Sequence, residues 1–133
     1  MAGHDEGSDD IALSELQLEL MRVLWTQGEA SVAGVAAALA ASRGLAHTTV
    51  ATLLSRLAAR GVVEARRDGR QLVYRAIVSE PQVRRTMVSG LIERLFSGDP
   101  KALLAHLVSE REVKPGDLEK VQALLAKAGR RRD

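Results

Sequence analysis

The chain of 133 residues has the length of one domain with a small appendage, and 46% of its residues are hydrophobic although only 2% are aromatic. This composition favours closely packed helices built from leucine, valine and alanine over a β-sandwich. The absence of cysteine excludes disulfides, thiolate nucleophiles and cysteine metal sites. The histidines, His4, His47 and His106, lie far apart without metal-ligand spacing, so neither a metal nor another cofactor is expected.

The net charge of +2 hides an uneven distribution along the chain. No lysine or arginine precedes Arg22, whereas seven arginines lie between Arg43 and Arg75, against only Glu64 and Asp68. Clustered positive charge favours an anionic partner, because binding a polyanion releases condensed counterions. The middle of the chain is therefore the candidate binding region.

The first twelve residues are rich in Gly, Ser and Asp and offer little to bury, so residues 1–12 are predicted to form a disordered acidic tail. They lack the basic start and apolar stretch of a signal peptide, and no apolar run approaches the ~20 residues that span a bilayer. The expected location is cytoplasmic, without membrane insertion.

Two helices are predicted after the tail. Ser14 is a good N-cap, Gln17 completes a capping box, and Gly28 marks the end of this first helix. Ser31 caps a second helix, which residues 42–44 separate from a third. The second and third helices, joined by a short turn, predict a helix-turn-helix, and the first helix would pack against both to complete the bundle.

The third helix, which begins after Ala46, has two distinct faces. One is an apolar stripe at helical spacing: Val50, Leu53, Leu54 and Leu57. The opposite face is small and hydroxyl-rich, with Arg56 beside it: Thr48, Thr52, Ser55 and Ala59. Such a face can approach the floor of a DNA major groove, where hydroxyls and arginine bind base edges or phosphates.

A short β-hairpin follows this helix. Residues 62–63 open one strand, residues 72–74 form the other, and Asp68-Gly69 is predicted to make the turn, with Arg66, Arg67 and Arg70 at the tip. A helix followed by a basic two-stranded wing indicates a winged helix-turn-helix. The alternative is a small α+β domain whose arginines are only solvated surface.

Three further helices are predicted, over residues 80–96, 102–109 and 115–128, with a pronounced apolar side. They are too thin to form an independent core, so pairing with a second copy is favoured over folding back as a monomer. The expected organisation is a disordered tail at 1–12, a winged-helix domain at 13–77, a helical dimerisation region at 78–129 and a solvated basic end at 130–133. The fold class is mainly α with a small β wing.

Several segments together resemble the penicillinase repressor family of winged-helix transcriptional regulators, often called BlaI/MecI/CopY. They are LSELQLELMRVLW at 13–25, AHTTVATLLSRLAARGVV at 46–63, GRQLVYRA at 69–76 and the helical tail through LLAHLVSE. The resemblance implies a homodimeric repressor that binds a dyad-symmetric, double-stranded operator. The implied DNA-binding residues are Thr48, Thr49, Thr52, Ser55, Arg56, Arg66, Arg67 and Arg70.

The resemblance also implies dimerisation through the C-terminal helices, and members of the family are released from DNA in two known ways. The expected dimerisation residues are Val88, Leu91, Leu95, Leu103, Leu104, Leu107, Leu118, Val121, Leu124 and Leu125. Copper-responsive members carry paired cysteine ligands, which this chain lacks, so metal sensing of that kind is excluded. In β-lactam-responsive members a membrane-linked metallopeptidase system leads to cleavage at an Asn-Phe bond; the matching position is His106-Leu107, which keeps the apolar residue but not the Asn.

Three classes of function remain to be compared. A winged helix used as a protein-interaction module would present an apolar or acidic outer helix face, unlike the face here. An enzyme would need converging acid, base or nucleophile groups, and none converge in the sequence. A ligand-responsive regulator stays open, as do the target genes, the inducing signal and the choice between repressor and activator.

Overall fold

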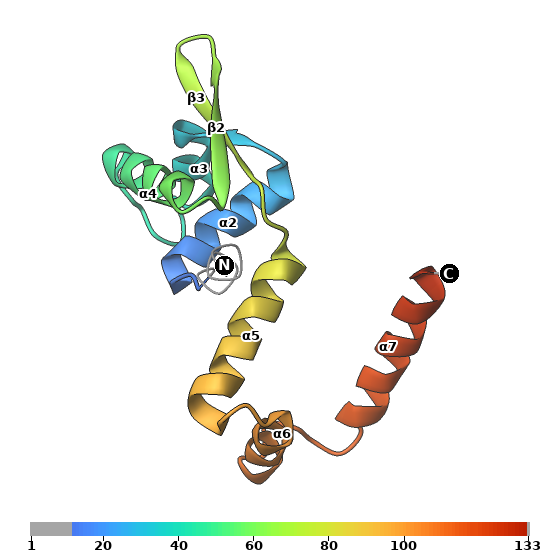
Figure 1. The fold of residues 1–133 in the computed structure, drawn as a ribbon. Coiled ribbons are helices and arrows are strands. Elements are labelled where there is room, and N and C mark those ends of the chain that lie inside the picture. Colours follow the sequence, from blue (N-terminus) through green and yellow to red (C-terminus); the bar gives the residue numbers. More distant parts are fainter. Residues whose placement is uncertain (1–11, 133) are drawn as a thin grey trace, which may run out of the picture. The chain divides into compact units, whose positions relative to one another are not determined.

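The computed structural model describes residues 12–132, so the predicted disordered tail lies outside the described residues except for Ala12. The elements, in chain order, are α2 (Glu15–Gln27), β1 (Ala30–Ser31), α3 (Val32–Ala38), α4 (His47–Ala59), β2 (Val63–Asp68), β3 (Gln71–Ala76), α5 (Glu80–Phe96), α6 (Pro100–Ser109) and α7 (Asp117–Arg132) (Figure 1). The expected fold class, mainly α with a small β wing, is confirmed.

The chain divides into two compact units, one ending at Val88 and the other beginning at Ser89. This division falls inside α5, later than the expected boundary between residues 77 and 78. The reason is packing: Val83 is buried in the core of the N-terminal unit, and Met87 packs against it. The first turns of α5 therefore belong to the winged-helix unit.

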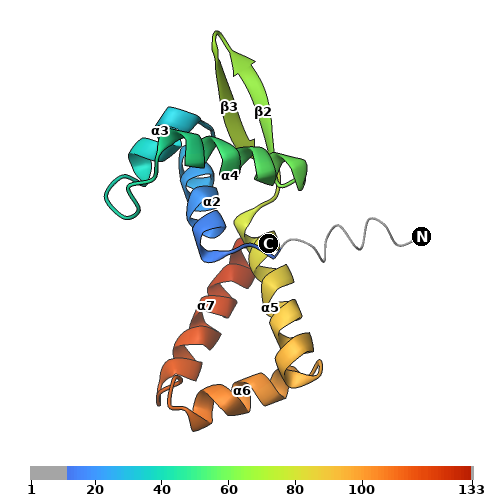
Figure 2. The ribbon, with the colours of Figure 1, turned by 90° about the vertical axis from the view of Figure 1, so that its left-hand side faces the viewer.

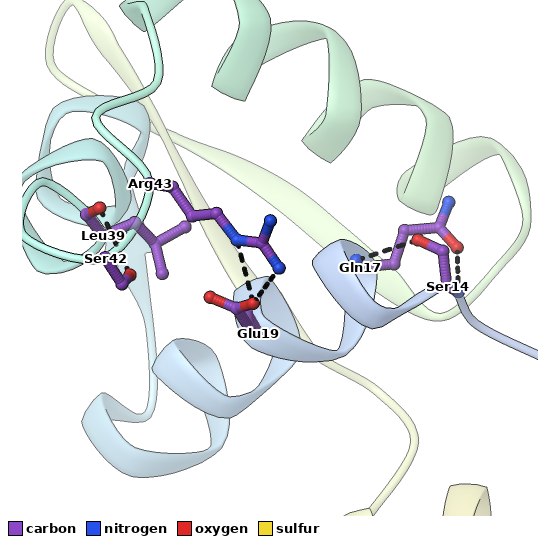
Figure 3. Close-up of polar contacts among 6 residues, drawn as sticks. All are labelled: Ser14, Gln17, Glu19, Leu39, Ser42 and Arg43. Atoms are coloured by element: carbon purple, nitrogen blue, oxygen red, sulfur yellow. Dashed lines mark hydrogen bonds and ion pairs between the residues drawn. The ribbon is translucent and has the colours of Figure 1, made fainter.

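Side-chain caps define where the first helices begin. At the start of α2 the Ser14 backbone N–H donates to Gln17 Oε1 (2.9 Å) and the Gln17 N–H donates to Ser14 Oγ (3.1 Å), which confirms the predicted capping box (Figure 3). Gly28 ends this helix at φ 88°, a left-handed conformation that favours glycine. Ser31 Oγ accepts from the Gly34 N–H and caps α3 as predicted.

The core of the N-terminal unit lies where α2, α3 and α4 meet the base of the hairpin. The helices contribute apolar side chains at helical spacing, in agreement with the sequence pattern, and the hairpin and the residue before it add the rest. The core includes Leu20, Met21, Leu24, Val35, Val50, Leu54, Leu57, Val62, Val63 and Tyr74. Trp25 closes its edge by donating from Nε1 to the Val78 carbonyl (2.9 Å). This packing fixes α4 with its apolar stripe inward.

The sheet has one strand more than the sequence predicts. Its order is β1-β3-β2, all antiparallel, and β1 pairs through Ala30 with Tyr74 and through Ser31 with Val73. The hairpin of β2 and β3 projects beside α4 (Figure 2). Because Asp68 pairs with Gln71, the turn consists of Gly69 and Arg70, not of Asp68-Gly69 as predicted; Gly69 has φ 64°, which suits a primed hairpin turn.

In the C-terminal unit, α6 and α7 differ slightly from their predicted bounds. Asp99 caps α6 by accepting from the Lys101 N–H (3.0 Å), so the helix starts at Pro100 and not at residue 102. The chain turns at Gly116 (φ 94°), so α7 starts at Asp117 and not at residue 115. It continues to Arg132, so the predicted end at residue 128 is wrong.

Among the described residues, no helix combines the length and apolar character needed to cross a membrane.

Candidate nucleic-acid interface

The hydroxyl-rich face of α4 is exposed along its length. Thr48, Thr52 and Ser55 are exposed, while Val50, Leu54 and Leu57 on the opposite side are completely buried. At 100° per residue, Thr49 and Arg56 flank this face on one side and His47 flanks it on the other; all three are exposed. The structure thus places every α4 residue predicted to contact DNA on the accessible side of the helix.

The hydroxyl of Thr52 has a defined polarity. Its Oγ1 donates to the Thr48 carbonyl oxygen at 3.0 Å, one helical turn earlier. With the proton so engaged, the oxygen presents only acceptor lone pairs outward. In a major groove those lone pairs match the amino groups of adenine or cytosine.

Arg66, one of the three predicted wing residues, is already engaged. Its guanidinium donates to both carboxylate oxygens of Glu29, from Nε at 3.2 Å and from Nη2 at 2.5 Å. The hydrogen bond from Arg66 lowers the pKa of Glu29, against a smaller opposing effect of desolvation. The pair ties β2 to the loop before β1.

Two more arginines of the basic segment have carboxylate partners. Arg43 donates from Nε to Glu19 Oε2 at 2.9 Å (Figure 3), and Arg75 pairs with Glu64, its neighbour across the hairpin. Within residues 12–132, Arg56, Arg67 and Arg70 have no such ion pair. The positive charge available to an anionic partner is therefore concentrated at one flank of α4 and at the wing.

A groove of about 400 Å³ separates the wing from the helices. Its lining combines two unpaired arginines with a histidine and neutral side chains: Ser31, Val32, Ala33, His47, Arg67, Arg70, Gln71 and Leu72. We call this the basic groove. His47 was not among the predicted DNA-binding residues, because nothing in the linear sequence shows that the wing lies along its flank of α4.

The residues predicted for dimerisation lie mostly at the surface of the chain. Leu118, Leu124 and Leu125 on α7 are between 61% and 66% exposed. Val88, Leu95, Leu104 and Val121 are also exposed, and Leu91, Leu103 and Leu107 are half-buried. Val88 belongs to the N-terminal unit, whereas the others belong to the C-terminal unit.

The predicted cleavage position lies inside a helix. His106 and Leu107 are interior residues of α6, and the His106 ring is exposed, with its centroid 5.8 Å from that of Phe96. The His106 and Leu107 carbonyls accept from the Glu110 and Glu112 N–H groups. The bond between them is thus held in regular hydrogen-bonded backbone.

No group of three or more His, Cys, Asp or Glu side chains in the described part of the chain could hold a metal ion.

Comparison with known proteins gives one family. The family model described as penicillinase repressor matches residues 13–127. The chain is similar to the transcriptional regulator BlaI of Mycobacterium tuberculosis, with 38% identity over 72% of this chain and 71% of the relative. It is also similar to the methicillin resistance regulatory protein MecI of Mammaliicoccus sciuri, with 21% identity over 86% of this chain and 94% of the relative.

A likeness of fold extends to the crystal structure of Rv0081 from Mycobacterium tuberculosis. The TM-score is 0.50 with 20% sequence identity, over 84% of this chain and 95% of that chain.

Proposed function

We propose that this chain, which belongs to the penicillinase repressor family and is a DNA-binding transcriptional repressor, acts as a homodimer on a dyad-symmetric double-stranded operator. The observation that carries the proposal is the exposed hydroxyl-rich face of α4, set between arginines on its own flank and on the wing that have no carboxylate partner within residues 12–132. The family consists of transcriptional repressors and not of enzymes.

The α4 residues take the base-reading role in this proposal. Thr48, Thr52 and Ser55 face the floor of the major groove, where Thr52 accepts from an adenine or cytosine amino group. Thr49 and Arg56 lie on the flank, where Arg56 reaches a guanine edge or a phosphate. These contacts distinguish operator from other sequences.

The wing arginines take two different roles. Arg67 and Arg70 contact the phosphate backbone, because both line the basic groove and lack a carboxylate partner among the described residues. Arg66 adds to the positive potential of the wing and, through Glu29, positions it against the loop before β1. Phosphate contacts of this kind set the register of a protein on duplex DNA without reading its sequence.

The dimer follows from the exposed leucines of the C-terminal unit. Apolar surface of this extent on a helical unit indicates a protein interface. A second copy doubles the DNA contacts and imposes two half-sites separated by about one helical turn or a multiple of it. One α4 with one wing would contact too little DNA for tight specific binding.

Footprinting of the full-length protein on the DNA upstream of its own gene tests the proposal. The expected result is protection of two symmetry-related half-sites that appear together as protein is added. Protection of one asymmetric half-site, unchanged by protein concentration, would contradict the dimer and leave only the DNA-binding role.

For release from the operator we propose proteolysis between His106 and Leu107 by a membrane-linked metallopeptidase system. The support is the family resemblance and the exposure of His106; α6 must unwind locally before a protease can engage the bond. A chain truncated after Ala105 is expected to lose dimerisation in sedimentation and to bind operator weakly.

If the truncated chain stays dimeric and binds as tightly as the intact one, proteolysis is not the signal. A small-molecule effector then becomes the better explanation. The chain offers a place for one in a pocket of about 170 Å³ in the N-terminal unit, where apolar side chains lie beside charged ones; it is lined by Leu18, Arg22, Trp25, Glu80, Val83, Arg84, Met87 and Val88.

A further inference from the structure

The basic groove has a composition that suits a phosphodiester. Arg67 and Arg70 supply permanent positive charge from the wing, and His47 lies at the start of α4 among the lining residues. Ser31 Oγ accepts from the Gly34 N–H, so its hydroxyl proton stays available, and the Gln71 side chain offers an amide donor. All these groups can donate to an anion.

His47 has a distinct place relative to the base-reading face. It lies on the flank of α4 away from Arg56, and its side chain lines the groove shared with the wing. A DNA strand whose bases meet Thr48 and Thr52 would run its backbone past this flank. His47 is thus placed beside phosphate and not beside a base edge.

We infer that the basic groove binds one phosphodiester strand of the operator, and that His47 in its protonated form is a phosphate ligand beside Arg67 and Arg70. The inference rests on the proposed function and deepens it. A protonated imidazole donates from both ring nitrogens, whereas the neutral ring turns one acceptor toward its surroundings. Operator binding is therefore coupled to uptake of a proton at His47.

The charged groups around His47 are few, which makes the coupling specific. Arg67 and Arg70 are the charged residues that line the groove with it. The sequences of α3, VAGVAAA, and of β1 contain no titratable side chain. The charged residues of α2, Glu15, Glu19 and Arg22, and Arg43 in the loop before α4 do not line the groove either, and Arg43 is paired with Glu19. The acidic residues of β2, Glu64 and Asp68, are likewise absent from its lining. DNA phosphate is therefore the anion that favours the charged ring.

The test compares operator binding near pH 6 and near pH 8, the range in which histidine changes charge. The probe is a duplex obtained by selection of random-sequence DNA with the full-length protein. The slope of log K against log salt is expected to be steeper near pH 6 by about 0.9 for each subunit, because one further phosphate is neutralised. Tighter binding at the lower pH accompanies the steeper slope.

Two variants isolate the residue. His47→Gln keeps a hydrogen-bond donor but cannot titrate, so its slope is expected to be the shallow one at both pH values. His47→Arg carries a permanent charge and is expected to show the steep slope at both. His106→Gln in α6 is the matched control and should keep the dependence on pH, and His4→Gln covers the remaining histidine.

The outcomes separate the two levels of the argument. Failure to select any duplex overturns the proposed function itself. A selected duplex whose salt slope does not change with pH, or a dependence that persists in His47→Gln, overturns the role of His47 and leaves the function standing. Loss of the dependence in His106→Gln also overturns it. Thermal unfolding of each variant shows whether the fold is retained, as expected for an exposed histidine.

Discussion

Leucine recurs at helical spacing in both compact units, but its side chains meet different surroundings. In the N-terminal unit Leu20 and Leu54 are completely buried by neighbouring helices and the hairpin. In the C-terminal unit Leu118 and Leu124 are more than half exposed, and no side chain described in α6 or α7 is buried. Leucines at helical spacing therefore predict a helix face that is buried, but they do not show whether the same chain or a second copy buries it.

This difference indicates a division of energetic roles. The N-terminal unit stabilises itself through its core and presents α4 and the wing. The C-terminal unit carries apolar surface whose burial, in the proposed dimer, comes from a second copy and so depends on protein concentration. The effect of a substitution in the C-terminal unit should therefore change when the protein is diluted, whereas that of a substitution in the N-terminal unit should not.

The largest expected effect is on stability, in a pair of leucines. Leu54→Ala removes a completely buried side chain and should lower the free energy of unfolding by about 2–5 kcal/mol at any protein concentration. Leu118→Ala, at a residue 61% exposed, should cost less than about 0.5 kcal/mol in protein dilute enough to be monomeric. Urea unfolding of the full-length chain measures both. Equal losses in dilute protein would show that Leu118 is covered within its own chain.

Substitutions in the two units should also differ in how they change operator affinity. Arg56→Ala should weaken binding by roughly 1–3 kcal/mol and relax base preference whatever the protein concentration, because Arg56 lies beside the reading face. Leu125→Asp, in α7, should weaken binding at low concentration and recover as protein is added, because it opposes dimerisation. Titrations at several protein concentrations distinguish them. A recovery of Arg56→Ala at high concentration would assign that residue to assembly.

Much of the fold could be predicted because its signals are local. The capping residues Ser14 and Ser31 and the glycine at 28 lie within a few residues of the helix ends they define. The sequence does not predict strand β1, because two residues are too few to show alternation and its pairing with Tyr74 depends on tertiary packing. The turn was misplaced by one residue because strand register sets which residues are left unpaired.

In the candidate site, too, the features set by local sequence could be predicted and those set by distant contacts could not. The exposure of the α4 face could be predicted, since the stripe of Val50, Leu54 and Leu57 fixes which side is buried. The ion pair of Arg66 could not be predicted, because its partner Glu29 lies 37 residues earlier in the chain. His47 acquires its surroundings only when the wing folds beside α4, so a reading of the linear sequence treats it as an ordinary histidine.

A smaller effect is expected at the wing, where neighbouring arginines differ in their partners. Arg67→Ala should flatten the salt slope of operator binding by about one for each subunit, and Arg66→Ala should flatten it less. The Arg66–Glu29 pair is about half exposed, so water screens it and it contributes little to stability. Glu29→Gln should therefore leave the protein folded, release Arg66 and steepen the slope. If Arg66→Ala flattens it as much as Arg67→Ala, Arg66 contacts phosphate directly.

The smallest effect is an acid sensitivity confined to the N-terminal unit. The hydrogen bond from Arg43 lowers the pKa of Glu19 below its ordinary value of 4.5, with burial opposing the change. A carboxylate with a lowered folded pKa adds stability that is fully present above the ordinary value and is lost as the pH falls through the lower one. Glu19→Gln should therefore lower the melting temperature slightly at pH 7 and have no effect once acid has protonated Glu19.

Glu110→Gln, at an exposed residue at the end of α6, should leave the melting temperature unchanged at both pH values. A deficit of Glu19→Gln that persists in acid would show that packing of the side chain, and not its charge, links α2 to the turn before α4.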